Sequence, residues 1–206
     1  MKQLLIKDWE LIKGSKNFYF ALFFLAGGVT GNYGDSQFFA MIPVIFSYYF
    51  FVNLNAYDYK YNASKFILSM PVNRREWVAS KYMLCIITCI FSFIVLLAMR
   101  IPFWTIGVLA DSFPKDMYIL VTIHSITLIY LGIAQMGYFK FGYMKMRLVN
   151  IVSMIVMGAL NNLSILFVER YGINIMGMVL FLLVSLGVYY LSFLTSVKIT
   201  EEKIVL

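Results

Sequence analysis

The sequence is poor in charge and cysteine, and each shortage excludes a class of protein. Only 13% of the 206 residues are charged and 62% are hydrophobic, whereas about 25% of a soluble domain is charged. We therefore assign the chain to the integral membrane class. Its two cysteines, Cys85 and Cys89, lie four residues apart in an apolar run. They form neither a disulfide framework nor a zinc motif, and we expect both to be buried thiols.

Ionisable residues are missing from the centres of the hydrophobic runs. None of the ten acidic residues falls inside a predicted span, and His124 is the one histidine. Carriers driven by protons or sodium usually keep an ionisable relay at mid-membrane, so the shortage argues against that class. It also argues against a membrane-embedded enzyme and a metal site. The chain has no Walker A motif, since Gly14-Ser15-Lys16 lacks the upstream glycine. We therefore expect no catalytic residue, cofactor or ATPase site in this chain.

Long apolar runs dominate what is present. A span needs about 20 apolar residues, and on that basis we predict an all-α integral membrane protein with six transmembrane helices in a single domain, residues 1–206. Five or seven spans stay open, because the first run is short and rich in glycine. The predicted spans cover about residues 17–33, 37–55, 80–100, 117–139, 148–168 and 173–197.

Residues 2–16 form the segment before the first span and have a helical polar pattern. Leu5, Trp9 and Ile12 share one face, and lysines lie mostly on another. This pattern predicts an amphipathic helix in the membrane interface. A plain helical extension of the first span is the alternative.

The basic residues predict how the chain is oriented. Lysine and arginine near span ends stay on the cytoplasmic side. With the N-terminus inside, only Arg100, Lys115 and Arg170 fall outside, among 17 basic residues. Both termini and the loop at residues 56–79 are therefore predicted to be cytoplasmic. The net charge of +7 is a topology signal, and the expected partner is the lipid bilayer and not nucleic acid.

The central loop, with the start of the third span, is the longest polar interruption in the chain. Residues 56–82 carry five basic residues and the helix-breaking Pro71. We expect residues 60–69 to form a short helix that ends before Pro71, since the residue before a proline avoids helical geometry. Exposed aromatic and aliphatic side chains beside lysines are typical of a protein contact. A loop that lies on lipid is the alternative. The exposed side chains would be Tyr59, Phe66 and Ile67, beside Lys60 and Lys65.

The pattern of this loop resembles the cytosolic loop of permease subunits in the type-two family of ABC exporters. Six spans, cytoplasmic termini and an amphipathic N-terminal helix are similar to that family as well. Met70 departs from the pattern, which has leucine before the proline. The matching residues are Asp58, Lys60, Leu68, Pro71-Val72, Arg74, Val78 and Lys81-Tyr82.

The resemblance implies a bacterial cell-membrane permease that pairs with a second permease, identical or paralogous. It would dock through a short cytosolic coupling helix on two ABC ATPase subunits, which bind the ATP and magnesium. Arg75 and Lys81 are interpreted as topology signals only. The candidate contact residues are Tyr57, Asp58, Lys60, Lys65, Phe66, Ile67 and Arg74.

Cargo and path are the least specified features. Similar small permeases export amphipathic peptides, such as phenol-soluble modulins, or lantibiotics in self-immunity. The candidate path-lining residues are His124, Gln135, Asn161 and Asn162, although each could instead join two helices. The alternative function is a non-transporting scaffold or sensor whose loop binds a partner.

Overall fold

The computed structural model describes residues 2–13, 36–62, 67, 73–105, 113–171 and 174–202. Within these ranges the chain is helical and forms no strand, which confirms the all-α prediction. The first predicted span, residues 17–33, lies outside them. The described helices are α1 (Lys2–Lys13), α3 (Ser36–Lys60), α5 (Arg74–Thr105), α6 (Phe113–Phe141), α7 (Tyr143–Tyr171) and α8 (Ile175–Glu202).

Four of the described helices contain a stretch that is long and apolar enough to cross a membrane. Six spans and the cytoplasmic termini stay predictions. The helices run past the predicted span limits: α3 continues from residue 55 to Lys60, and α5 begins at Arg74 instead of residue 80. Backbone hydrogen bonding does not stop where hydropathy falls, so a helix extends beyond the apolar run that reveals it. The four stretches are Arg74–Ala98, Pro114–Phe141, Tyr143–Leu160 and Ile175–Glu202.

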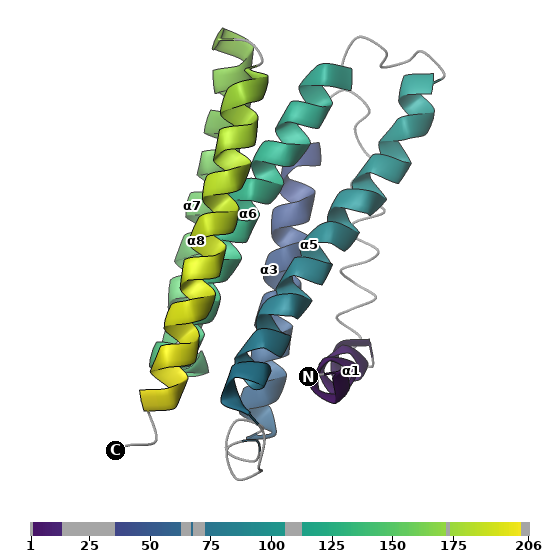
Figure 1. Ribbon diagram of the computed structural model, residues 1–206. Helices are drawn as coiled ribbons and strands as arrows, with labels where there is room; N and C mark the ends of the chain where they lie inside the picture. The colour runs from purple at the N-terminus through teal and green to yellow at the C-terminus, as the bar shows by residue number, and fades with distance from the viewer. Residues whose placement is uncertain are drawn as a thin grey trace.

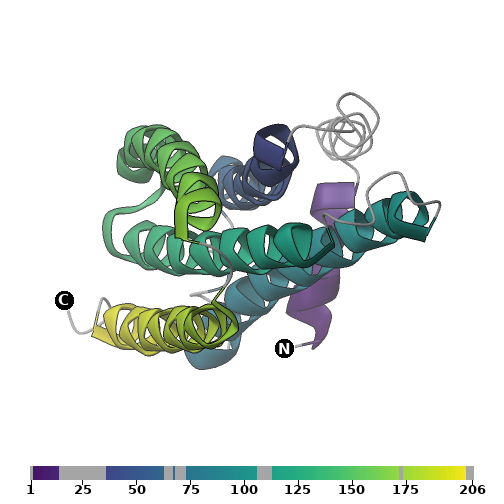
Figure 2. The ribbon, with the colours of Figure 1, turned by 90° about the horizontal axis from the view of Figure 1, so that it is seen from above.

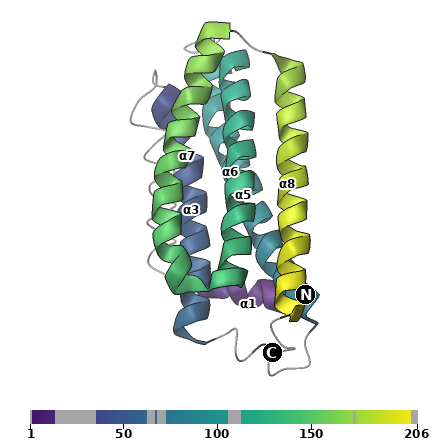
Figure 3. The ribbon, with the colours of Figure 1, turned by 90° about the vertical axis from the view of Figure 1, so that its left-hand side faces the viewer.

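The long helices run side by side as a bundle, and α1 lies across one end of it (Figures 1 and 3). Seen from above, α6 lies between α7 and α8 (Figure 2). Helix α6 packs against α3, α5, α7 and α8, whereas α1 packs against α3 and α5. In the membrane-length stretch of α6, 67% of the residues are buried, against 17% in that of α8. Helix α6 is therefore the centre of the fold and α8 lies at its edge.

Helix ends follow local capping rules. The Asn73 side chain accepts a hydrogen bond from the Arg75 backbone N–H at 3.0 Å and caps α5. Gly142, with φ of 80°, lets α6 turn directly into α7. Asn62 has φ of 49°, a left-handed conformation that closes α3.

The described end of α3 corrects the predicted start of the coupling helix. Lys60 is the last residue of α3, and residues 61 and 62 form a turn. A new helix therefore does not begin at Lys60. The rest of the predicted segment, apart from Ile67, lies outside the described residues.

Candidate functional site

Lys81 forms the centre of a buried ion cluster at the end of the bundle that α1 crosses. Its Nζ lies 2.6 Å from Asp58 Oδ2 and 3.0 Å from Asp8 Oδ2. The Lys81 side chain is 0% exposed, and both carboxylates are 1% exposed. Lys7 Nζ lies 3.0 Å from Asp8 Oδ1 and 3.9 Å from Asp58 Oδ1. We call these four residues the ion cluster; with two charges of each sign, it is neutral overall.

The ion cluster joins three segments that are distant in sequence. Asp8 comes from α1, Asp58 from the last turn of α3, and Lys81 from the second turn of α5. The central loop runs from α3 to α5, so both of its ends are tied to each other and to α1. A charge removed from water is costly unless an opposite charge compensates it. Separating these helices would leave such a charge without its partner.

The predicted contact residues are placed in different ways. Asp58 is buried in the ion cluster, whereas Tyr59 and Lys60 are exposed beside it. Tyr57 is partly buried and stacks on Tyr61, with ring centroids 6.3 Å apart. Arg74 is partly buried at the start of α5.

Ile67 corrects one expectation, because its side chain is only 6% exposed. It belongs to the apolar core that also contains Trp77 and Val78, so it is not a surface anchor. Lys65 and Phe66 lie outside the described residues, and their role stays a prediction. Lys81 was interpreted as a topology signal only; its pairing with two carboxylates gives it a structural role.

Tyr82, the next residue of α5, makes a second polar contact, with α8. Its hydroxyl lies 2.7 Å from Ser192 Oγ and 2.8 Å from Ser196 Oγ. The Tyr189 hydroxyl donates to the Tyr82 carbonyl at 2.7 Å. We call these four residues the hydroxyl network. All five buried residues of α8 carry a hydroxyl group: Ser185, Tyr189, Ser192, Ser196 and Thr200.

The fully buried side chains of α8 are thus polar, whereas its exposed sides are mostly apolar, as expected for a helix that faces lipid. Lipid tails solvate apolar surface, and interhelical hydrogen bonds help to hold such helices together. The hydroxyl network therefore fastens α8 to α5.

Two predicted path residues join helices instead of lying free. His124 Nδ1 lies 2.8 Å from the Leu120 carbonyl, which can only accept, so Nδ1 carries the proton. His124 Nε2 lies 3.1 Å from the Ser92 hydroxyl of α5, whose one proton is shared between Nε2 and the Cys89 carbonyl at 2.9 Å. Gln135 Oε1 accepts from the Asn55 amide of α3 at 3.4 Å.

These bonds favour the helix-joining interpretation for His124 and Gln135, and path lining stays a prediction. The side chains of Asn161 and Asn162 lie outside the described residues. Cys85 and Cys89 are buried, as expected. Over the described residues, no group of three His, Cys, Asp or Glu side chains could hold a metal ion.

Comparison with known families decides the kind of protein. Residues 3–201 match the family described as ABC-2 family transporter protein. The chain belongs to the ABC-2 transporter family. This membership confirms the resemblance found in the central loop, and with its apolar helices it makes this ABC-2 protein a multi-pass membrane protein and a permease component of an ABC transporter. No curated protein and no solved structure matches the chain.

The ion cluster and the hydroxyl network of this ABC-2 protein were missed by sequence reasoning. Lys81 follows the central loop directly, so it looked like one more positive charge at a span end. A signal for the network was present: Tyr189, Ser192 and Ser196 recur at helical spacing in an otherwise apolar run. Nothing in the sequence predicts that Asp8 pairs with Lys81. Hydrophobic periodicity shows which residues share a helix face, but not which other helix that face contacts.

Proposed function

We propose that this ABC-2 protein is the permease subunit of an ATP-driven exporter, and that it docks on separate ATPase subunits through residues 56–79. The observation that carries the docking proposal is the ion cluster. A load on the exposed end of α3, at Tyr59 and Lys60, reaches α5 and α1 together because Asp58, Lys81 and Asp8 hold them. The loop is therefore suited to receive a push and to pass it into the membrane helices.

In this mechanism, two ATPase subunits bind ATP and magnesium and close on each other. Their closing moves the loop, and α3, α5 and α1 tilt as one unit against the rest of the bundle. The path lies between two permeases, identical or paralogous. The membrane end with the ion cluster faces the cytoplasm, with α1 in the interface. Exposed Ile6 (47%) and Trp9 (40%) on α1 support that position, since tryptophan favours the headgroup level.

The proposed cargo is an amphipathic or antimicrobial peptide. The apolar exposed surfaces of the helices support this choice, because an apolar wall accommodates varied greasy side chains. Amphipathic peptides are therefore the probes used in the test below.

Arg74 and Arg75 allow a matched test, because they are neighbours of equal charge. Arg74 is partly buried and falls in the family pattern, whereas Arg75 is exposed and was assigned only to topology. The permease is co-purified with its ATPase in mild detergent and placed in vesicles. We expect Arg74→Ala to reduce peptide-stimulated ATP hydrolysis about tenfold, which corresponds to about 1.4 kcal/mol of coupling.

The control Arg75→Ala should keep at least half of the stimulation, and both variants should insert in the membrane normally. Failure of the wild-type chain to co-purify with any ATPase would contradict the proposal. ATPase binding without ATP-dependent peptide movement would favour the scaffold or sensor.

A further inference from the structure

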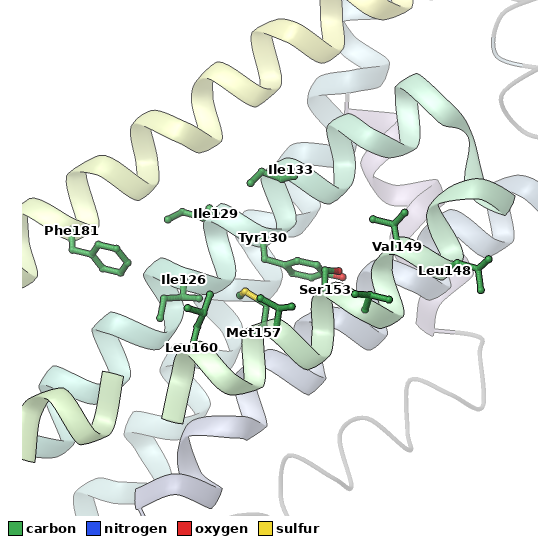
Figure 4. Close-up of a pocket in the computed structure, with 12 residues that line it drawn as sticks. Ile126, Ile129, Tyr130, Ile133, Leu148, Val149, Ser153, Met157, Leu160 and Phe181 are labelled. Carbon is green, nitrogen blue, oxygen red and sulfur yellow. The ribbon is translucent and has the colours of Figure 1, made fainter. Parts of the chain in front are cut away.

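A lateral groove lies between α6, α7 and α8 (Figure 4). Its volume is about 850 Å³ and twelve residues line it. Ten of these are aliphatic side chains, methionine or Phe181; the other two are Tyr130 and Ser153, whose hydroxyl groups lie close together in the middle (Figure 4). Helix α6 forms the floor, α7 forms one wall, and α8 contributes Phe181. The groove therefore suits an apolar occupant.

The length of the groove matches one leaflet of a bilayer. Its α7 wall runs from Leu148 to Leu160, and twelve steps of 1.5 Å give roughly 18 Å. Half of the hydrocarbon core is about 15 Å thick. An acyl chain that entered from one membrane surface could thus lie along the whole groove.

Positive charge gathers where the groove meets the turn between α6 and α7. Lys140 lies in the last turn of α6 and Lys145 in the first turn of α7; both are exposed. The helical period places each on the same face of its helix as the residues that line the groove. Gly142 reverses the chain between α6 and α7, so these basic residues lie at the same end of the bundle. Over residues 117–168, neither α6 nor α7 contributes an acidic residue. The mouth of the groove is therefore basic.

We propose that this groove is a binding site for one anionic phospholipid. The acyl chain lies along residues 148–160 of α7 on the floor of α6, and the phosphate contacts Lys140 and Lys145. Basic pockets between membrane helices favour anionic headgroups, since the positive side chains attract the phosphate. The apolar groove alone would bind the acyl chain of any phospholipid. The positive charge at its mouth favours a phospholipid with a negative headgroup. The site does not depend on ATPase docking.

The test compares two phospholipids with identical acyl chains. The purified full chain is incubated with phosphatidylglycerol or phosphatidylcholine, and bound lipid is counted by native mass spectrometry. We expect about tenfold greater retention of phosphatidylglycerol. The double variant Lys140→Gln/Lys145→Gln should abolish the preference and leave weak binding of both lipids. A matched loss of two charges elsewhere, Arg75→Gln/Lys198→Gln, should preserve it.

Filling the groove separates chain binding from headgroup attraction. Val152 lines the groove and is 61% exposed, so Val152→Trp has room and should remove retention of both lipids. Val156→Trp, at a second lining position, should do the same if the first variant is poorly folded. Ile90→Trp, on an exposed part of α5 outside the groove, is the control and should bind lipid normally.

Two outcomes would overturn the proposal. Equal retention of the two lipids by the wild-type chain would show that the mouth does not select charge. Unchanged lipid retention in Val152→Trp, with dissociation of a dimer on size-exclusion chromatography, would show that a second copy covers the groove.

Discussion

Lys81 and Tyr82 are neighbours in α5, yet they fasten the helix in opposite directions and by different chemistry. Lys81 reaches α1 and α3 and binds two buried carboxylates. Tyr82 reaches α8 and shares neutral hydroxyl hydrogen bonds. A buried ion pair fails badly when one partner is lost, because the remaining charge stays buried. A hydroxyl network loses less, because Ser192 also has the Gly132 backbone carbonyl as a partner.

This difference makes the ion cluster a rigid contact and the hydroxyl network an adaptable one. The ion cluster ties the central loop to α1, where the proposed push enters. The hydroxyl network joins α5 to α8, which belong to the two parts that move against each other in the proposed mechanism. Hydroxyl groups can exchange partners at low cost, which suits a sliding contact, whereas the ion cluster suits a contact that moves as a unit.

The largest effect is expected from Lys81→Met. This change keeps the apolar stem but leaves Asp8 and Asp58 buried without their main counter-charge. Loss of one partner from a buried pair costs about 3–5 kcal/mol. Chemical unfolding in mixed micelles should show a loss of stability of this size.

The control for this prediction removes the carboxylates as well. The triple variant Asp8→Asn/Asp58→Asn/Lys81→Met carries no buried charge at these positions and should recover most of the lost stability. If Lys81→Met unfolds like the wild type, the ion cluster does not fasten α5 and the comparison fails.

A smaller effect is expected from Tyr82→Phe. The ring stays in place, and only the hydroxyl that bonds Ser192 and Ser196 is lost. Interhelical hydrogen bonds in membranes contribute about 0.6 kcal/mol on average, so two bonds predict a loss of about 1 kcal/mol in the same assay. Tyr190→Phe, at a position 58% exposed on α8, is the control and should change stability very little. If Tyr82→Phe lowers the stability as much as Lys81→Met does, the ion cluster and the hydroxyl network do not differ in the way described.

The sequence was sufficient for the class of fold, because apolar runs follow directly from the thickness of a bilayer. The resemblance of the central loop to ABC-2 permeases was also readable, and the family match confirms it. Contacts between residues distant in the sequence could not be predicted from it. Asp8 and Lys81 lie more than seventy positions apart, and neither stands out from the other charges near span ends. Ile67 looked like a surface anchor because it sits in a polar loop, yet tertiary packing buries it.

Effects no larger than that of Tyr82→Phe are expected at two glycines of α6, and their opposite signs would sharpen the comparison between tight and adaptable contacts. A Cβ at Gly132 would lie 3.1 Å from Tyr189 Cδ2 and 3.4 Å from its Cα, in the hydroxyl network. Neither the ring nor the backbone can move without disturbing the bonds around Tyr82. The three atoms nearest to a Cβ at Gly137 all belong to Met146, with its Cε at 2.5 Å and its Sδ at 2.7 Å. That side chain ends in a flexible thioether, which can rotate away.

Alanine improves a helix over glycine by about 1 kcal/mol, whereas overpacking costs about 1–3 kcal/mol. Gly132→Ala should therefore lower the stability by about 1 kcal/mol, and Gly137→Ala should raise it by about 0.5 kcal/mol. Each glycine is the control for the other, since both lie in α6 and the change is the same. If Gly132→Ala also gains stability, Tyr189 can give way, and the contact between α6 and α8 is as adaptable as the methionine contact between α6 and α7.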